Sequence, residues 1–440
     1  MAADARPGGR EGRPLSDCGT SADTIYALSS GAPPAAVAVV RISGPRADAA
    51  LADLAGALPE PRRTRLATLR HNGEVLDKAL IIRFPGPASA TGEDVAELHL
   101  HGGRAVVTGV LAALKEIPGL REAVPGEFTR RAFEHGRIDL AEAEGLADLL
   151  EAETETQRRA AMRLAGGALS REVQRWQERL LGLAAEVEAA LDFSDEDDVR
   201  PLAADFDERL GTLRQELANW LARPPAERLK DGIRVVVAGP PNAGKSSLLN
   251  ALVARDAAIV TALPGTTRDV IEVPAAIRGV AFLFIDTAGL REPADAIEAI
   301  GIDRARLSLE AADILLWLGP PAERPVNAIQ IHSKADLGAA VREPGLRLSA
   351  PTGEGLDRLI DVLVEEARAL LPREGEIALN ARHRTAVEDM LAGIADAGSD
   401  DLLIAAEGLR GARAAADRIT GAAGVEDMLD ALFGRFCIGK

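Results

Sequence analysis

The stretch Gly239–Ser247, with the sequence GPPNAGKSS, constrains this chain more than any other part of it. It fits the phosphate-binding template G-x-x-x-x-G-K-[ST], and it stands between an apolar run (residues 233–238) and a helix-forming run (residues 248–253). In that context the backbone N–H groups of the loop close around phosphates at the start of a helix. On this stretch alone, a glycine-rich turn before an ordinary helix is the alternative.

Each residue type in the loop has an expected task. Lys245 would reach the β and γ phosphates of a nucleotide, and the Ser246 hydroxyl would hold magnesium. The loop residues predicted to contact the nucleotide are Asn242, Ala243, Gly244, Lys245, Ser246 and Ser247.

Two later motifs, each at the end of an apolar strand, favour a guanine-nucleotide hydrolase. Asp286 would meet magnesium through water, and the Gly289 N–H would sense the γ phosphate. The Asp336 carboxylate would accept two hydrogen bonds from guanine, which selects GTP over ATP. The predicted contacts from these motifs and from the strand end that follows them are Asp286, Thr287, Ala288, Gly289, Ser333, Lys334, Asp336, Ser349 and Ala350.

The segment PGTTRD (residues 264–269) predicts a mobile loop that brings Thr267 to magnesium in the triphosphate state. Arg268 is either an arginine finger or a surface residue paired with Asp269. One departure concerns the base. GTPases normally carry Asn where this chain has Ser333, so we expect looser nucleotide binding without a change of base.

Composition limits the possible partners and surroundings. The formal net charge is −17, whereas a polyanion-binding protein ordinarily shows a basic excess, so any nucleic-acid contact must be a local patch or depend on a partner. The two cysteines, Cys18 and Cys437, are too few for a disulfide framework and fit a reducing, cytoplasmic environment. No apolar run is long enough to predict a membrane span.

The 440 residues predict several domains. Strands alternate with helices after Lys230, which is typical of a doubly wound, mostly parallel α/β sheet. The helical tail resembles the helices before that sheet, so we expect the sheet domain to be inserted into one discontinuous α-helical bundle. The predicted division is a disordered extension (residues 1–22), an α+β domain (23–122), the first segment of the helical domain (123–230), the nucleotide domain (231–373) and the second segment of the helical domain (374–440).

Taken together, the motifs resemble those of the tRNA modification GTPase family MnmE, also called TrmE. The segments that carry the resemblance are DTIYALSS, VVRISGP, TGEDVAELHLHGG, PGEFTRRAFEHGRIDLAEAEGLADL, GPPNAGKSSLLNAL, PGTTRD, DTAGLRE, SKAD, LSAPTGEG and the terminal FCIGK. The resemblance extends from Asp23 to Lys440.

The resemblance implies a potassium-activated GTPase that works with the FAD-containing flavoprotein MnmG. Together they install an aminomethyl-type (carboxymethylaminomethyl) group on carbon 5 of the wobble uridine of certain tRNAs. The family's one-carbon donor is 5-formyltetrahydrofolate or methylenetetrahydrofolate, bound by an N-terminal domain that also forms the homodimer, and a heterotetramer with MnmG is expected.

The resemblance also assigns residues. Folate contacts fall on Arg41, Glu97, Arg137 and Lys440, although the family usually has Lys where this chain has Arg137. Potassium ligands fall on Asn242, Thr261, the Leu263 carbonyl and Thr266. Glu298 matches the residue that orients water, with a solvated helix Glu as the alternative. Cys437 would act as a nucleophile or relay, or would be an inert packed thiol.

The rival interpretation is a regulatory GTPase that assembles ribosomes or other RNA without modifying it, as GTPases with the same PGTTRD loop do. Such a factor should add a basic RNA-binding domain, which this acidic chain does not contain. A nucleotide-switched scaffold is a third alternative.

Overall fold

The computed structural model describes residues 23–192, 202–256, 258–259, 271–286, 312–338, 344–422, 429, 432–434, 436 and 438–439, with the backbone alone at residues 255–256, 258–259, 271 and 286. The chain forms two compact units, Met1–Ala147 with Ala423–Lys440, and Asp148–Ala422. The predicted extension 1–22 and the residues 193–201 lie outside the described residues.

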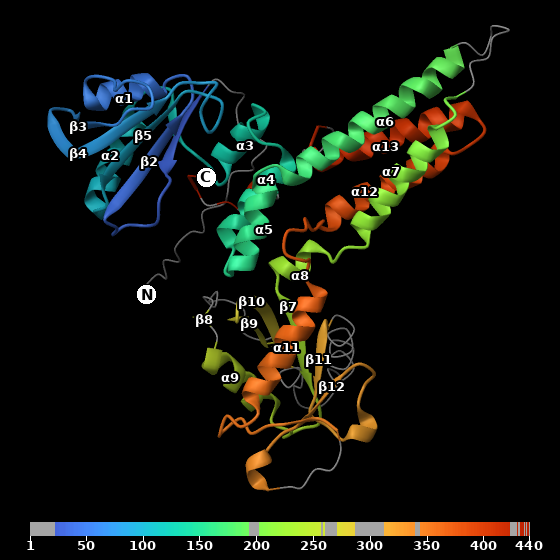
Figure 1. The fold of residues 1–440 in the computed structure, drawn as a ribbon. Helices are drawn as coiled ribbons and strands as arrows, with labels where there is room; N and C mark the ends of the chain where they lie inside the picture. Colours follow the sequence, from blue (N-terminus) through green and yellow to red (C-terminus); the bar gives the residue numbers. More distant parts are fainter. Residues whose placement is uncertain are drawn as a thin grey trace, which may run out of the picture. The chain divides into compact units, whose positions relative to one another are not determined.

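A six-stranded sheet forms the body of the first unit (Figure 1). Its strand order is β3-β4-β5-β2-β1-β6, and all neighbours are antiparallel except β1 and β6. The strands are β1 (Thr24–Leu28), β2 (Val37–Ser43), β3 (Arg65–His71), β4 (Glu74–Phe84), β5 (Val95–His101) and β6 (Leu120–Glu122).

Alternation along the strands decides which side chains reach the core. Ala38, Val40 and Ile42 of β2 are buried, and they pack with residues of α1 (Ala47–Ala55) and α2 (Arg104–Glu116). Side chains of a strand alternate between its faces, so Arg41 belongs to the opposite face of the sheet. Arg41 is the direct cross-strand partner of Glu97 on β5, which puts both on that face.

The first unit also contains α3 (Glu127–Glu134) and the larger part of α4 (Leu140–Glu151). The C-terminal segment returns to this unit. Leu429, Phe433 and Phe436 pack in one apolar cluster with Leu140 and other residues of α4. The Ser29 hydroxyl donates to the Gly439 carbonyl at 2.7 Å, which ties the chain end to the residue after β1.

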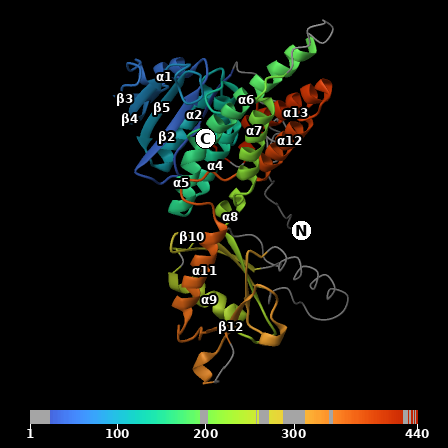
Figure 2. The same ribbon diagram turned by 45° about the vertical axis from the view of Figure 1, so that its right-hand side comes forward.

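The second unit contains a helical bundle with contributions from both sides of the nucleotide sheet in the sequence. α12 packs against α13 and α7, and α13 packs against α6 (Figures 1 and 2). A Cβ at Gly393 would lie 2.4 Å from the Gly408 carbonyl, so glycine permits the close approach of α12 and α13. The helices are α5 (Glu155–Ala165), α6 (Ala168–Asp192), α7 (Phe206–Leu221), α8 (Ala226–Lys230), α12 (Ala381–Ala397) and α13 (Leu402–Thr420). This confirms the predicted discontinuous helical bundle.

The nucleotide sheet has the order β13-β12-β11-β7-β10-β9-β8. The strands from β13 to β10 are parallel, and β9 runs antiparallel to β10 and β8. The elements are β7 (Ile233–Ala238), β8 (Ala258–Ile259), β9 (Ile271–Ile277), β10 (Val280–Asp286), β11 (Ile314–Trp317), β12 (Ile329–His332), β13 (Leu346–Arg347), α9 (Lys245–Asp256) and α11 (Leu356–Leu370). The predicted doubly wound, mostly parallel sheet is therefore confirmed. Within the described chain, no helix combines the length and apolar character needed to span a bilayer.

Candidate functional site

The predicted phosphate loop connects the central strand β7 to α9. Gly239 has φ of +146°, and a Cβ there would lie 3.1 Å from the Leu318 carbonyl carbon, so a side chain would strain the turn. Lys245 is buried, and its ammonium donates to the Gly239 and Pro240 carbonyls at 3.0 Å each. Its charge is therefore held against the loop, where anionic phosphates would bind. Ser246 and Ser247 lie in the exposed first turn of α9.

The end of β10 lies beside the start of this loop. Asp286 is the parallel register partner of Val237, one residue before the end of β7. Carboxyl ends of adjacent parallel strands form the binding edge of such sheets, so the backbone places Asp286 at the predicted edge.

Several predicted site residues lie outside the described part of the chain. They are Thr261, Leu263, Thr266, Thr267, Thr287, Ala288, Gly289, Glu298, Cys437, Lys440 and the side chain of Asp286. Their roles stay predictions.

The segment after β12 is tied directly to the phosphate loop. The Ser333 hydroxyl donates to the Ala243 carbonyl at 2.7 Å, and the Lys334 ammonium donates to the Asn242 carbonyl at 2.9 Å. Both Lys334 and Asn242 have positive φ, a conformation that few non-glycine residues adopt. Ser333 thus links the phosphate loop to the segment after β12, as the Asn that GTPases normally carry at this position would, but through a single donor.

The remaining predicted base contacts follow the same edge of the sheet. Asp336 is exposed in the turn after Lys334, while Ser349 is fully buried after β13. The Ala335 N–H donates to the Leu348 carbonyl at 3.1 Å, which joins these two segments next to Ser349 and Ala350. The exposed carboxylate of Asp336 is accessible to a ligand.

Two of the predicted folate contacts lie together on the sheet of the first unit. Arg41 donates from Nε and Nη2 to Glu97 Oε1 at 3.0 and 2.9 Å. His99 Nε2 lies 3.2 Å from Glu97 Oε2, and the Arg41 guanidinium lies 5.7 Å from the centre of the Phe128 ring. The result is a polar patch of three side chains with an aromatic neighbour.

Arg137 is placed separately. It is exposed after α3, and its Cγ lies 3.4 Å from the position that a Gly92 Cβ would take. Among the described residues, no hydrogen bond or ion pair joins Arg137 to Arg41 or Glu97. The two histidines of β5 also have separate partners, since His101 Nδ1 lies 2.7 Å from Asp77 Oδ1. In the part of the chain that the structure describes, no group of His, Cys, Asp or Glu has metal-site geometry.

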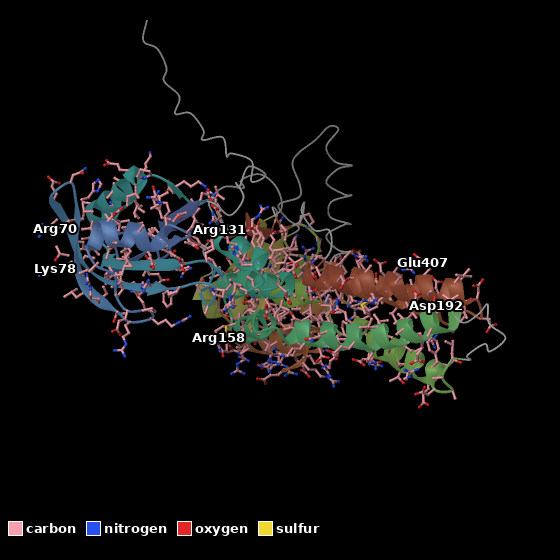
Figure 3. The ribbon with its side chains drawn as sticks, turned by 90° about the horizontal axis from the view of Figure 1, so that it is seen from above. Arg70, Lys78, Arg131, Arg158, Asp192 and Glu407 are labelled. Atoms are coloured by element: carbon pink, nitrogen blue, oxygen red, sulfur yellow. The ribbon has the colours of Figure 1, made fainter. Side chains whose placement is uncertain are left out.

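Sequence reasoning missed a buried ionic network in the first unit, centred on Arg131, the residue labelled in Figure 3. Arg131 pairs with Asp23 at 2.7 Å, with Glu93 at 3.0 Å and with Glu127 at 3.1 Å. Arg121 pairs with the same Asp23 and Glu127 at 2.5 Å each. The only local signal is the i,i+4 spacing of Glu127 and Arg131, because the other partners come from distant segments.

The network shifts the pKa values of its members. Burial alone would raise the pKa of Glu127, but hydrogen bonds and charges from Arg121 and Arg131 outweigh burial and hold this pKa below its ordinary value. The same balance lowers the pKa of Asp23. Burial would lower the pKa of Arg131, and the charges of Glu93 and Glu127 raise it instead. These three members are therefore ionised at neutral pH.

Comparison with known proteins covers almost the whole chain. Residues 140–437 match the family model described as the MnmE helical domain, and residues 24–137 match the one described as the GTP-binding protein TrmE N-terminus. The tRNA modification GTPase MnmE of Erythrobacter litoralis is 58% identical over 95% of this chain and 100% of its own length. That of Rhizorhabdus wittichii is 59% identical over 96% and 97%.

A solved structure, the G domain of the T. maritima FeoB iron transporter, is 26% identical over 31% of this chain and 98% of its own length, with a TM-score of 0.24. The two family matches and the near-complete relatives lead to one conclusion: the chain belongs to the family of tRNA modification GTPases MnmE.

Proposed function

We propose that the chain hydrolyses GTP to GDP and phosphate, with magnesium, and takes part in the modification of tRNA. The observation that carries this function is the phosphate loop with its buried Lys245 and its Ser333 tether, in a chain that belongs to this family along nearly its full length. Glycines at the turns and an ammonium held against the loop carbonyls fit the triphosphate of GTP. Ser246 would hold the magnesium, with Thr267 joining it in the triphosphate state.

The guanine base would bind at the same edge of the nucleotide sheet as the phosphates, beside the segments that follow β12 and β13. Asp336 would accept two hydrogen bonds from guanine, while Ser349 and Ala350 would line the opposite side. The exposed carboxylate of Asp336 and the bonded loops around it support this arrangement.

Hydrolysis would be assisted by potassium rather than by an arginine finger. A monovalent cation beside the β and γ phosphates offsets the charge that develops there. Asn242 at the tip of the loop, with Thr261, the Leu263 carbonyl and Thr266, would hold the ion, and Glu298 would orient water. Exposure of Asn242 supports its part in this set.

The modification would be the addition of a carboxymethylaminomethyl-type group to carbon 5 of the wobble uridine of certain tRNAs. We propose that a reduced folate supplies the carbon unit and binds near Arg41 and Glu97, with Arg137 and Lys440 contributing. The paired, partly exposed Arg41 and Glu97 beside Phe128 provide charge and an aromatic surface for such a ligand. Cys437 would take part in the modification chemistry. The chain would act in the cytoplasm, where tRNA is modified.

The assembly would be a homodimer that joins the FAD-containing MnmG in a heterotetramer. Paired nucleotide domains would close and open with the GTP cycle and so gate the chemistry.

Hydrolysis by the purified chain in potassium and in sodium, at matched ionic strength, tests the ion-assisted mechanism. We expect faster hydrolysis in potassium. Equal rates in the two salts would remove potassium from the mechanism, while absence of hydrolysis in both would contradict the GTPase function itself.

A further inference from the structure

The second unit contains a basic cavity that the GTPase site does not use. Its volume is about 450 Å³, and arginines line it from three segments: α5, the turn between β9 and β10, and the residues at and after the end of α11. These arginines are Arg159, Arg163, Arg278, Arg368 and Arg373. Five guanidinium groups around one hollow contrast with the net charge of −17 of the whole chain.

The carboxylates that line the cavity are already occupied. Glu374 Oε1 accepts from Arg159 at 2.5 Å, and Glu376 Oε2 accepts the Arg373 backbone N–H at 3.1 Å. Arg278 pairs with Asp361. Glu374 and Asp361 thus pair with two of the five arginines, whereas Glu376 accepts only a backbone N–H, so the lining carries five arginines and two carboxylates.

Three arginines of the cavity have no ion pair within the described residues: Arg163, Arg368 and Arg373. Arg163 lies over the chain after α11, because its Nη1 would be 3.2 Å from a Cβ at Gly375. Exposed cations held near one another repel, and a bound polyanion removes that repulsion. Unpaired guanidiniums are also the groups best suited to bidentate phosphate binding.

The shape of the basic surface favours a chain of phosphates over a single anion. The five arginines line a hollow of about 450 Å³ from three segments of the chain, which is more space than one phosphate group fills. A second hollow of about 350 Å³ shares Arg278 and Arg368 with the first and adds no further arginine. Asp361 and Glu365 lie on this second hollow, so the phosphate contacts belong mainly to the first.

The cavity also joins two structural elements of the unit. The Thr156 hydroxyl of α5 donates to the Gly279 carbonyl in the β9–β10 turn at 3.4 Å, next to the cavity arginines. Arg158, labelled on the same helix in Figure 3, pairs with Glu155 and does not line the cavity. A ligand here would contact α5 and the turn of the nucleotide sheet together.

We propose that this cavity binds the phosphate backbone of tRNA, an assignment that rests on the proposed function. Arg163, Arg368 and Arg373 make the direct contacts, and Arg159 and Arg278 contribute charge. The site resolves the conflict between an acidic chain and a polyanionic substrate, since contact is confined to a local basic surface.

The test uses the full chain and an unmodified tRNA transcript, with affinity measured by fluorescence anisotropy at salt concentrations from about 50 to 200 mM. The variant is Arg163→Gln/Arg368→Gln/Arg373→Gln. The control is Arg214→Gln/Arg324→Gln/Arg413→Gln, which removes the same charge at arginines outside the cavity. Thermal melting of both variants checks that each folds like the unaltered chain.

We expect the cavity variant to bind tRNA about tenfold more weakly or worse, with a slope of log Kd against log salt smaller by roughly 2 to 3, because each lost phosphate contact removes about 0.7 to 0.9. The control should change neither quantity by a comparable amount. Equal affinities and slopes for the two variants would overturn the assignment, as would absence of tRNA binding by the unaltered chain.

A competition arm identifies the source of the phosphates. If the unaltered chain binds tripolyphosphate more tightly than the cavity variant does, while the cavity variant binds tRNA normally, the ligand is a free polyphosphate and the tRNA assignment fails. The proposed function is judged separately, by tRNA modification in cells that lack the chain, so the cavity can fail while the function stands.

Discussion

The Ser333 hydroxyl joins the base side of the nucleotide site to the phosphate loop through its 2.7 Å bond to Ala243. We predict that Ser333→Ala weakens GTP binding about fivefold, because a hydrogen bond contributes about 1 kcal/mol net. Ser333→Asn should tighten binding, since a side-chain amide offers two N–H donors and a carbonyl acceptor, whereas a hydroxyl offers one donor besides its acceptor oxygen. Titration with a fluorescent GTP analogue measures both changes, and identical affinities for all three proteins would show that the tether contributes nothing.

Lys245 carries the positive charge of the phosphate loop. Its ammonium would exchange the Gly239 and Pro240 carbonyls for phosphate oxygens, where it stabilises developing negative charge. We expect Lys245→Ala to lower GTP hydrolysis about a hundredfold or more. Lys78→Ala, at an exposed position of β4, is the matched control and should hydrolyse GTP normally. A Lys245→Ala protein with normal turnover would place the phosphates elsewhere.

Asp336 is the residue on which base choice depends. Asp336→Asn replaces a carboxylate oxygen, an acceptor, by an amino group, a donor. It should therefore weaken GTP binding about a hundredfold and favour the xanthine nucleotide, which presents an oxygen where guanine presents an amino group. Competition between GTP and XTP measures the preference. Asp231→Asn, exposed between α8 and β7, is the control, and unchanged selection of GTP by Asp336→Asn would remove Asp336 from base recognition.

Among the elements of the first unit, α3 is fixed by the ionic network at Arg131. Replacement of a buried, multiply paired arginine leaves carboxylates without partners. Arg121 still pairs with two of them, so we expect Arg131→Met to lower the free energy of unfolding by about 3 kcal/mol, at the low end for a broken buried pair. Arg63→Met, in an exposed pair with Glu60, should cost less than about 1 kcal/mol. Denaturant unfolding of the two variants compares them, and equal losses would contradict the energetic role of the network.

The same network predicts a pH dependence of stability. Glu127 and Asp23 have folded-state pKa values below the ordinary 4.5 and 3.8, so the unfolded chain binds more protons in acid. Their stabilisation is therefore present above these ordinary pKa values and is lost as the pH falls through the lower, folded-state pKa values. Glu127→Gln should make the acid loss of stability shallower, and denaturant midpoints measured from neutral pH into acid test it. An unchanged slope would show that Glu127 does not titrate in this way.

The strands and helices that could be predicted are those whose signal lies in their own residues and in the residues next to them. The apolar run before Gly239 and the helix after it form β7 and α9, and β10 and β12 end at the two later nucleotide motifs, where apolar strands were predicted. Strands with weak local signals were not predicted: β3 lacks a regular alternation of apolar and polar residues, β6 has three residues, and β9 contains a proline. Their formation depends on partners brought together by the rest of the sheet.

At the scale of the molecule, the predicted insertion of the nucleotide sheet into a helical bundle is confirmed by the packing of α12 and α13 on α7 and α6. The exact domain limits stay a prediction. The Arg131 network and the arginine cavity could not be predicted, because each combines side chains far apart in sequence, such as Asp23 with Arg131 and Arg163 with Arg368. Sequence patterns report neighbours along the chain, whereas these clusters depend on how elements pack.

We propose above all that GTP hydrolysis by this chain supports tRNA modification. The most direct measurement is mass spectrometry of nucleosides from tRNA of cells that lack the chain and are complemented with the unaltered or the Lys245→Ala protein. We predict that wobble-uridine modification is lost on deletion, restored by the unaltered chain and not restored by Lys245→Ala. Normal modification in the deletion strain, or full rescue by Lys245→Ala, would contradict the claim.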